Sequence, residues 1–401
     1  MAAYACDPGS GSEGSYGWNY STELARRGHE VHVLVASRWR DRLRQHLLHS
    51  PVDRLSFHYV DEPRWPMRFG WSVGNSLRYV AWQRRASAVA LTLDRLHGFD
   101  VVHHVSYGTL LGGSYLWRLG KPLVFGPTGG GQTTPWTLLP YFGRDATREI
   151  ARTLVTRYLW VLDRPAVETA RAAAVILTSN PETAALARRM GARRVESMPD
   201  VHLADHLVAG PRTPADAHPV RLLWVGRFLG RKGQRLTVEA LVLVPPDVDV
   251  TLDMVGDGPL FAEFHDWLEA SVHPHAVTLR GRIPWADVLR AYGDADVFVF
   301  TPLRESAGAQ FLEAMAHSLP VIALDHQGAS VLVTREAGLK VPVASMAVTR
   351  RGVADAIARL GADAQLRASF GAGARSRALE FTLTRRVDRL EAIYRQIVAG
   401  Q

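Results

Sequence analysis

The chain has 401 residues, of which 47% are hydrophobic and 21% charged, a composition typical of a globular protein long enough for two domains. No apolar segment is long enough to span a membrane, and the first residues lack the basic and hydrophobic regions of a signal peptide, so a cytoplasmic protein is expected. The single cysteine, Cys6, excludes an intrachain disulfide and a metal site built from cysteines. A formal charge of +8 fits nucleic acid, an anionic membrane or a phosphorylated substrate, although solvated surface charge is the commonest explanation.

Lysine is rare in this chain. Of the 47 basic residues only Lys121, Lys232 and Lys340 are lysines, and the rest are arginines. Where arginine is the default cation, a lysine indicates a position that requires a compact ammonium group. Lys232, which lies in a glycine-bounded loop, is therefore the most informative of the three.

The N-terminal part of the chain reads as a series of strands, loops and helices. A short strand over residues 2–6 leads into a loop rich in glycine and serine, a helix follows over 16–24, and a second strand covers 31–35. Glycines in such a loop let the backbone approach a ligand, so Gly11 and Gly14 are candidate phosphate contacts. A flexible turn explains the same glycines.

Two arginine-rich segments, 38–54 and 78–95, are predicted to be surface helices. Their interleaved Trp, Leu and Val residues also fit contact with a membrane surface, because peripheral enzymes use basic amphipathic helices for that purpose. Both interpretations remain open.

Two further strands end on residues suited to chemistry. The strand 99–102 ends on His103 and His104, and the strand 123–125 ends on a run that contains the glycines 129–131. In a parallel sheet the ligand crevice lies beyond the carboxyl ends of the strands, where both features are expected. Because side chains alternate along a strand, only one histidine can face the crevice, and a structural histidine is the alternative to a catalytic one.

Strands over 173–178 and 195–198 complete this half of the chain. Residues 205–219 are polar, rich in Pro, Gly and Ala, and without periodicity. We place the domain boundary there, which gives an N-terminal domain of residues 1–205 and a C-terminal domain of residues 206–401.

The second half begins a new series with the strand 222–225. The loop after it carries Arg227 and Lys232 at the carboxyl end of the strand. Two cations in this place can stabilise the charge of a diphosphate without a divalent metal, and a surface ion pair is the plainer interpretation. Strands over 250–255 and 277–279 follow.

A polar loop and a helix after the strand 297–300 carry two carboxylates. The next strand covers 321–324, so the unit is β-α-β and its sheet is expected to be parallel. If residues 306–309 begin the helix, their unpaired N–H groups form an anion site. Glu305 and Glu313 flank that site and can accept hydrogen bonds from the hydroxyls of a phosphate-centred ligand such as a nucleotide sugar. A loop charge and a solvated helix residue are the alternative.

No metal site is expected. The triplets Asp247-Val248-Asp249 and Asp294-Ala295-Asp296 precede strands and so lie on the side of the sheet away from the crevice. The tail after Val353 is predicted to be helical, and we expect its last helix to pack back on the N-terminal domain.

Together these motifs resemble the family 4 glycosyltransferases, whose α/β fold, called GT-B, has two Rossmann-like domains facing each other across a cleft. The resemblance spans nearly the whole chain. In the second half it rests on Val225-Gly226-Arg227, Lys232-Gly233, Gly256-Asp257-Gly258-Pro259, Glu305 with Glu313-Ala314-Met315-Ala316, and Pro320-Val321-Ile322-Ala323; in the first half it rests on Asp7-Pro8-Gly9, Gly11-Ser12-Glu13, Gly17-Trp18-Asn19, Asp100-Val101-Val102-His103-His104 and Gly126-Pro127.

The resemblance implies a retaining enzyme that transfers a sugar from a nucleotide-diphosphate sugar to a hydroxyl acceptor. It implies a front-face reaction in which the leaving phosphate helps to deprotonate the acceptor, with no enzyme nucleophile, no metal and no cofactor besides the nucleotide sugar, for which UDP is favoured. No nucleic-acid partner is expected. A nucleotide-sugar epimerase of the same fold and a non-catalytic partner protein are the alternatives.

The resemblance also implies roles for single residues. The diphosphate would be held by Arg227 and Lys232, the sugar hydroxyls by Glu305 and the ribose by Glu313. The pair Ser306-Ala307 replaces the Gly-Phe common in the family, which could alter the donor-sugar pocket. The catalytic candidates are His104, His103, Arg227, Lys232 and Glu305; the donor-binding candidates are Gly11, Gly14, Arg227, Lys232, Arg282, Ile283, Glu305, Ser306, Ala307, Gly308, Ala309 and Glu313; the acceptor-binding candidates are Glu13, Gly129, Gly130 and Gly131.

Overall fold

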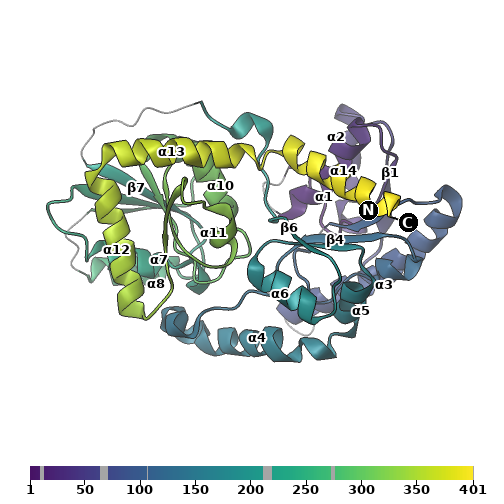
Figure 1. The fold of residues 1–401 in the computed structure, drawn as a ribbon, viewed down its shortest axis with the longest axis horizontal. Coiled ribbons are helices and arrows are strands. Elements are labelled where there is room, and N and C mark those ends of the chain that lie inside the picture. Colours follow the sequence, from purple (N-terminus) through teal and green to yellow (C-terminus); the bar gives the residue numbers. More distant parts are fainter. Residues whose placement is uncertain (10–12, 64–70, 106, 211–218, 272–275, 401) are drawn as a thin grey trace. The chain divides into compact units, whose positions relative to one another are not determined.

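The structure is a computed structural model that describes residues 1–9, 13–63, 71–105, 107–210, 219–271 and 276–400 (Figure 1). The chain forms two compact units. Unit 1 contains residues 1–131, 156–200 and 383–401, and unit 2 contains residues 132–155 and 201–382. The units therefore differ from two continuous halves, because an internal segment joins unit 2 and the C-terminal helix joins unit 1.

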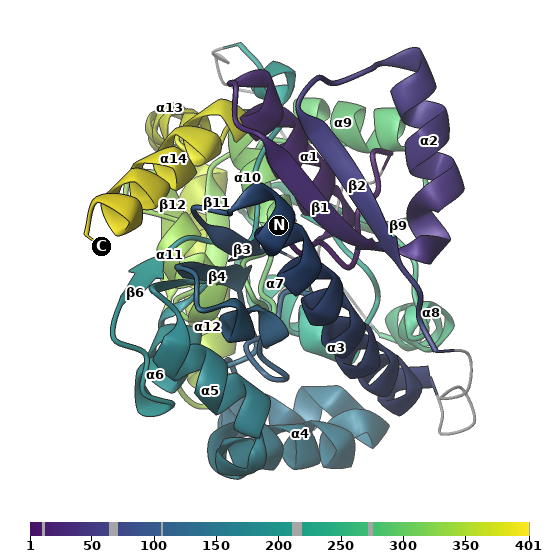
Figure 2. The same ribbon diagram turned by 90° about the vertical axis from the view of Figure 1, so that its right-hand side faces the viewer.

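Unit 1 is built on parallel strands. Strands β1 and β2 pair with each other, and β3 to β6 pair in chain order in a four-stranded sheet. Figure 2 shows β1 and β2 side by side, with the long helix α3 near them. The strands are β1 (Val31–Ala36), β2 (Leu55–Val60), β3 (Val102–His104), β4 (Leu123–Thr128), β5 (Val175–Thr178) and β6 (Val195–Ser197); the helices are α1 (Glu13–Arg26), α2 (Arg40–His49), α3 (Trp71–His97), α5 (Arg164–Ala172), α6 (Pro181–Arg189) and α14 (Leu383–Ala399), with 3-10 turns η1 (Ser37–Trp39), η3 (Tyr115–Leu119) and η5 (Leu159–Leu162).

The predicted first strand over 2–6 is reduced to one bridging residue. Ala2 forms bridges to Leu34 of β1 and to His104 of β3, and so connects the two sheets of unit 1. After it the chain leaves the sheet to enter α1, and the N–H of Asp7 donates to the carbonyl of Gly14 in the first turn of that helix (2.8 Å). The prediction of a five-residue strand was wrong, since Ala2 is the one residue among 2–6 that forms bridges to neighbouring strands.

Unit 2 has one six-stranded parallel sheet with the order β12-β11-β10-β7-β8-β9. The first strand in sequence, β7, is central, and the order reverses between β7 and β10. Helices lie on both faces of the sheet (Figure 1). The strands are β7 (Val220–Val225), β8 (Val250–Val255), β9 (Val277–Gly281), β10 (Val297–Val299), β11 (Val321–Leu324) and β12 (Gly338–Val341); the helices are α7 (Gln234–Leu241), α8 (Phe261–Glu269), α9 (Trp285–Asp294), α10 (Ala309–Ala316), α11 (Gln327–Leu332), α12 (Met346–Ala362) and α13 (Ala364–Leu379), with η4 (Trp136–Asp145), η6 (Asp205–Leu207) and η7 (Gly230–Lys232); α4 (Ala146–Tyr158) continues η4.

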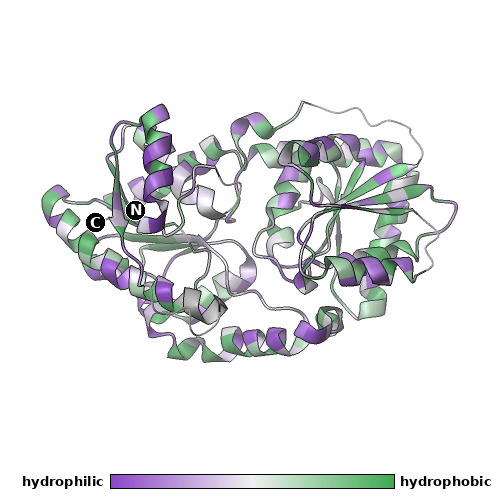
Figure 3. Ribbon diagram, turned by 180° about the vertical axis from the view of Figure 1, so that it is seen from behind, coloured by the Kyte–Doolittle hydropathy of each residue, from purple (hydrophilic) through white to green (hydrophobic). Residues whose placement is uncertain are grey.

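Apolar residues gather on the strands inside both units, and the helices carry both apolar and polar residues, as Figure 3 shows by colour. All residues of β10 and β11 are buried, as expected for parallel strands covered on both faces. Strand β12 and helix α11 were not predicted. Both are short, and α11 begins at Gln327 in a left-handed conformation (φ 51°), which no helix signal announces. Among the described residues no helix combines the length and apolar composition required to cross a bilayer.

The strand that carries the histidine pair lies further along the chain than predicted. Strand β3 covers Val102–His104, so both histidines lie inside the strand and not after it. The preceding residues belong to the exit of α3, because the N–H of Phe99 donates to the carboxylate of Asp94 (2.8 Å). Both histidines are buried.

Helix α14 packs on unit 1 through polar as well as apolar contacts. Arg27 of α1 forms ion pairs with Asp388 (2.7 Å) and Glu391 (3.2 Å). The hydroxyl of Tyr394 donates to Nδ1 of His103 (2.5 Å), whose Nε2 donates to the carbonyl of Gly126 (2.6 Å). Burial lowers the pKa of His103 to about 3, so this ring stays neutral between α14 and β4.

The neutral His103 makes the stability of the protein sensitive to acid. Its pKa is lower in the folded than in the unfolded state, so its contribution is complete above pH 6.5 and is lost as the pH falls towards the folded value. We expect His103→Gln to remove about 1.5 kcal/mol of the stability loss between pH 6.5 and 5, measured by urea unfolding at each pH. The exposed His49 provides the control, since His49→Gln should leave the pH dependence unchanged. If the free energy of unfolding depended on pH equally in both variants, the conclusion that the His103 ring is neutral would be wrong.

Candidate functional site

A site is expected where the strand order of the unit 2 sheet reverses. Strands β7 and β10 are hydrogen-bonded neighbours there. The chain continues from β7 to β8 towards one edge of the sheet and from β10 to β11 towards the other edge. In open parallel sheets the crevice at such a switch point, outside the carboxyl ends of the strands, is the usual place for a ligand. The loops that follow β7 and β10 are therefore the candidate site.

The two loops are joined into one rigid feature. The N–H of Leu303 donates to the carbonyl of Arg231 (2.8 Å). Gly233 has φ 72°, and a Cβ there would lie 1.9 Å from the carbonyl oxygen of Thr301, so only glycine permits this approach. The glycine after Lys232 thus fixes the position of Lys232 beside the loop that follows β10.

A buried ion cluster forms where the loops meet. Nζ of Lys232 donates to Oε2 of Glu305, and Nη1 of Arg231 contacts the same oxygen at 3.1 Å. The side chains of Lys232 and Glu305 are only 7% and 13% exposed. Within the described residues the other oxygen of Glu305, Oε1, makes no such contact. The cluster therefore holds an excess positive charge and one carboxylate oxygen that can accept a hydrogen bond from a ligand.

Burial and charge act in opposite directions on these groups. Burial raises the pKa of Glu305, but the charges of Lys232 and Arg231 outweigh it and bring that pKa below the ordinary value. Burial lowers the pKa of Lys232, and the charge of Glu305 opposes this shift. Each charge is tolerated inside the protein because the other is present.

Gln327 fixes the backbone of Glu305. Its Oε1 accepts the N–H of Glu305 (2.7 Å), and its Nε2 donates to the carbonyl of Thr133 (2.8 Å). Next to it, Gly328 brings α11 against the loop, since a Cβ there would lie 2.4 Å from Cα of Ala307. Ala307 is itself buried, so its methyl group belongs to the core of unit 2.

Helix α10 begins later than predicted. Its first residue is Ala309, and the residue before it, Gly308, has φ 92°. A Cβ on Gly308 would lie 2.9 Å from the ring of Phe311, so the entry to the helix depends on glycine. The expected anion site at 306–309 therefore shifts, because the N–H donors without intrahelical partners belong to the first turn of α10 from Ala309 onward.

Glu313 lies within α10 and is engaged by another helix. Its Oε2 accepts a hydrogen bond from the hydroxyl of Tyr292 in α9 (2.8 Å), and the ring of His317 stacks on Tyr292. Burial raises the pKa of Glu313 in spite of this hydrogen bond and the charge of Lys232. The plain interpretation of a solvated helix residue is therefore wrong for Glu313.

The remaining donor candidates are dispersed. Arg227 is exposed and makes no ion pair within the part of the chain that the structure describes. Arg282 is exposed, and Ile283 lines a cavity of about 280 Å³ beneath α9. Gly11 lies outside the described residues. Gly14 is in the first turn of α1, where its carbonyl is bonded to Asp7.

The acceptor and histidine candidates all belong to unit 1. The N–H groups of Gly129 and Gly131 donate to the carbonyl of Gly108 (2.9 Å) and to the hydroxyl of Thr183 (3.1 Å), so these donors serve the fold. Gly130 has φ 100°. Glu13 begins α1, and its side chain is outside the described set.

The two histidines of β3 point to opposite faces, as alternation along the strand requires. His103 faces α14, as described above. His104 is bonded through Nε2 to the hydroxyl of Tyr79 (2.7 Å) and through Nδ1 to the hydroxyl of Ser114 (2.8 Å). Both rings are buried, and both nitrogens of each ring are bonded.

The sequence analysis missed three supports of the site. Arg231 shares the carboxylate of Glu305 with Lys232, and its place in a glycine-bounded loop next to that lysine is a signal that could have identified it. Gln327 carries no pattern that marks it. Arg304 forms a two-point ion pair with the buried Glu149 of α4 (2.7 and 3.0 Å), and no sequence pattern connects these distant residues.

The buried pair provides a stability test. We expect Glu305→Gln to lower the free energy of unfolding by about 3–5 kcal/mol, because it leaves the ammonium of Lys232 buried without a counterion. The double variant Lys232→Met/Glu305→Gln should regain most of that loss, as measured by urea unfolding. Arg235→Ala, which removes an exposed partner of Glu239, is the control and should cost less than about 1 kcal/mol. If the double variant lost as much free energy of unfolding as the two single substitutions together, Lys232 and Glu305 would not be energetically coupled.

Comparison with known proteins agrees with this architecture. The profile described as "Glycosyl transferases group 1" matches residues 219–363, and the profile described as "Glycosyltransferase Family 4" matches residues 14–199. A D-inositol 3-phosphate glycosyltransferase of Saccharomonospora viridis is 37% identical over 115 residues, which are 28% of this chain and 26% of that protein. The chain thus spans about a quarter of this curated relative in the match.

Solved structures show the same fold at low identity. A sucrose-phosphate synthase from Thermosynechococcus elongatus is similar over 100% of this chain and 98% of its own, with a TM-score of 0.68 and 20% identity. The lipopolysaccharide outer core galactosyltransferase WaaB in its apo form covers 98% of each chain, with a TM-score of 0.64 and 13% identity. HepE from Anabaena in complex with UDP covers 96% of this chain and 98% of its own, with a TM-score of 0.62 and 18% identity.

The two profiles match both halves of the sequence, and the structural neighbours share the fold over nearly the full chain, which confirms the predicted α/β fold of the GT-B type. The chain belongs to the family 4 glycosyltransferases, also described as glycosyl transferases group 1.

Proposed function

We propose that this protein is a retaining glycosyltransferase that moves a sugar from a UDP-sugar to a hydroxyl acceptor. One observation carries the proposal: Lys232 and Arg231 are held on Glu305 at the switch point of the unit 2 sheet, beside the start of α10. Fixed positive charge beside the N–H donors of a helix start supports the binding of a diphosphate here.

Each group of the site has a role in this reaction. Lys232 and Arg231 stabilise the negative charge that develops on the diphosphate as the sugar leaves, with Arg227 as a third, exposed cation. Oε1 of Glu305 accepts hydrogen bonds from sugar hydroxyls, and Glu313 accepts one from the ribose. The leaving phosphate takes the proton of the acceptor hydroxyl on the same face of the sugar. The residues therefore bind, orient and stabilise charge, and none of them acts as a nucleophile.

UDP is the favoured nucleotide. HepE from Anabaena, which shares the fold, has been solved with UDP and with UDP-glucose. The relatives act on different acceptors by name, since one is an inositol phosphate glycosyltransferase and another a lipopolysaccharide galactosyltransferase. The proposal for this chain is accordingly a UDP-sugar donor and an acceptor hydroxyl.

Of the two histidines in β3, we propose that His104 contacts the donor sugar. Burial holds His103 neutral between two protein partners, whereas His104 is bonded to two hydroxyl groups, Tyr79 and Ser114, that can change donor and acceptor roles. We assign the acceptor side of the reaction to unit 1, which contains His104, and the donor side to unit 2.

The phosphate-binding role of Arg231 can be tested against a nearby arginine. We expect Arg231→Ala to weaken UDP binding about 10–100-fold, because one charge-assisted contact to phosphate is lost. Arg235→Ala is the matched control: that side chain lies on the next helix and pairs with Glu239, so its removal should leave UDP affinity unchanged. Isothermal titration of both variants with UDP provides the measurement, and a panel of UDP-sugars identifies the donor by thermal stabilisation.

Several outcomes would oppose the reaction as proposed. If Arg231→Ala bound UDP as tightly as the wild-type protein, Arg231 would not be a phosphate-binding residue. Turnover should not require added Mg²⁺ or Mn²⁺, since the site supplies its own cations, and strict dependence on either would count against it. An inverted anomeric centre in the product, seen by nuclear magnetic resonance, would exclude retention. Release of free UDP from the UDP-sugar without any acceptor would indicate an epimerase instead.

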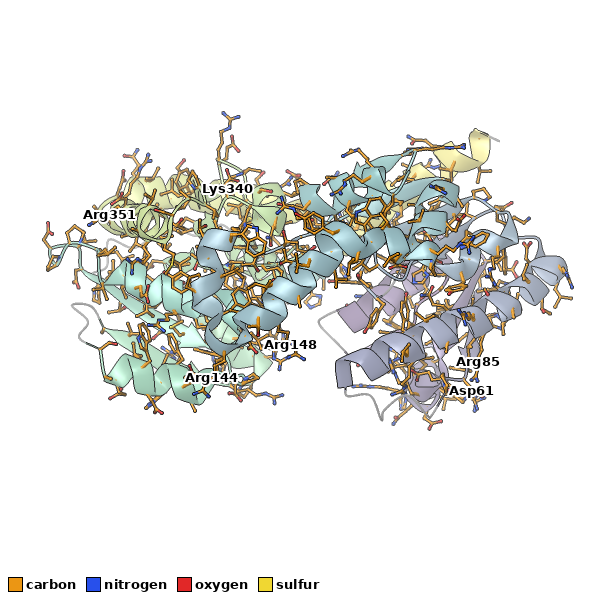
Figure 4. The ribbon with its side chains drawn as sticks, turned by 90° about the horizontal axis from the view of Figure 1, so that it is seen from below. Asp61, Arg85, Arg144, Arg148, Lys340 and Arg351 are labelled. Carbon is orange, nitrogen blue, oxygen red and sulfur yellow. The ribbon has the colours of Figure 1, made fainter. Side chains whose placement is uncertain are left out.

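We also propose a cytoplasmic location with contact at a membrane surface. The support is an exposed apolar segment at the end of α4 and in η5, where Tyr158 is 59%, Val161 58% and Leu162 77% exposed. Exposed arginines lie in the same unit, among them Arg157 in the last turn of α4 and Arg85 of α3, the latter labelled in Figure 4. Apolar residues that insert at the headgroup level, with arginines attracted to anionic lipids, are typical of peripheral proteins.

The membrane surface can be distinguished from the arginine-rich segment 38–54. We expect the wild-type protein to sediment with vesicles that contain anionic lipid, and Leu159→Asp/Leu162→Asp to lose most of that binding because charge replaces inserted apolar groups. Leu48→Asp in α2, at a residue that is 83% exposed, is the control and should bind as wild type does. If only Leu48→Asp lost vesicle binding, the membrane contact would belong to α2. If the wild-type protein did not bind vesicles, the proposed membrane contact would be wrong.

A further inference from the structure

A cavity of about 480 Å³ lies in unit 1 on the side of the sheet away from the carboxyl ends of the strands. Residues around the start of β1, the connection from α3 to β3 and the end of α14 line it. Because ligands of open parallel sheets bind at the opposite ends of the strands, the proposed transferase reaction gives this cavity no role. Its lining includes the histidines His29, His32, His97 and His103.

Three potential metal ligands meet at the wall of this cavity. Oε1 of Glu30 lies 3.1 Å from Nε2 of His32 and 3.8 Å from Nδ1 of His97. All three ligand atoms lie within 4.8 Å of one another. Glu30 and His32 come from the start of β1, and His97 is the last residue of α3. The backbone therefore holds the three groups from two different elements.

The distances between these ligand atoms match the distances between ligand atoms around a bound zinc ion. Ligand atoms about 2.0–2.2 Å from a tetrahedral zinc ion are about 3.3 Å apart. The two distances from Glu30, 3.1 and 3.8 Å, lie on either side of that value. Two imidazoles and one carboxylate, with a fourth position open to the cavity, form the ligand set of zinc sites that keep a water.

A supporting histidine orients the ring of His32. Nδ1 of His32 and Nε2 of His58 are 3.0 Å apart, and His32 is buried. When Nδ1 of His32 donates to Nε2 of His58, the lone pair on Nε2 of His32 is directed at Glu30. Metal-bound histidines are held in this way by a partner on the second nitrogen.

We propose that Glu30, His32 and His97 form a binding site for a divalent transition-metal ion of the zinc type, with the fourth coordination position open to the cavity. The ion links the end of α3 to the start of β1, far apart in sequence, and therefore stabilises unit 1. The site goes beyond the proposed transfer reaction and uses none of its residues.

Titration of protein that carries no affinity tag and has been stripped with a chelator tests the proposal. We expect the protein to bind one Zn²⁺ per chain, and its melting temperature to rise by about 3 °C or more at saturation. With Co²⁺ in place of Zn²⁺, we expect the strong visible absorption of a tetrahedrally coordinated cobalt ion. His97→Ala should abolish the absorption and the melting shift. His58→Leu should weaken Zn²⁺ binding about 10–100-fold, as expected for loss of a supporting group.

His29→Ala is the matched control for surface histidines. His29 lines the same cavity, but its ring contacts Glu391 and takes no part in the triad. We expect this variant to bind Zn²⁺ as wild type does. Absence of the Co²⁺ absorption in wild type, or equal loss of binding in His29→Ala and His97→Ala, would overturn the proposal. UDP binding by the metal-free protein, measured in parallel, should be unchanged in all these variants, which separates failure of this site from failure of the donor site.

Discussion

The buried ion pair between Lys232 and Glu305 is the interaction on which the candidate site depends. Neither charge would be stable alone at that depth, and Arg231 adds a second cation to the same carboxylate oxygen. The cost of burying these charges is offset only when the loops after β7 and β10 are held together. That constraint explains why glycine is required at Gly233, where any side chain would collide with Thr301.

The loop after β10 is also fixed from a distant part of the sequence. Residues 132–155 group with unit 2, and Glu149 within them accepts both guanidinium contacts of Arg304 while it is bonded to the hydroxyl of Thr134 (2.7 Å). The charge of Arg304 lowers the pKa of Glu149 although burial raises it. Gln327 adds a second connection to this segment. Glu305 follows Arg304 directly, so its position is set by residues that precede it by more than a hundred places in the chain.

Several features that suggest catalysis in the sequence serve the fold of unit 1. His103 and His104 lie in a strand with both ring nitrogens of each bonded, and the N–H groups of Gly129 and Gly131 donate to Gly108 and to Thr183 of α6. The proposed chemistry therefore rests mainly on the cations and backbone donors of unit 2, and His104 is the contact proposed from unit 1. The histidines at the other end of the unit 1 sheet, which no sequence motif marked, are the ones placed to bind an ion.

The α/β class and the parallel strands of both units follow from the amino-acid sequence alone, because hydrophobic periodicity is a local property, and loop composition pointed to Lys232, Glu305 and Glu313 as candidates. Which groups meet depends on the tertiary structure. Arg231, Gln327 and the pair Arg304 and Glu149 come together through the sheet order and the exchange of segments between units, which no local pattern encodes. The start of α10 at Ala309 was likewise set by tertiary contacts, because the turn at Gly308 leaves no room for a side chain beside the ring of Phe311.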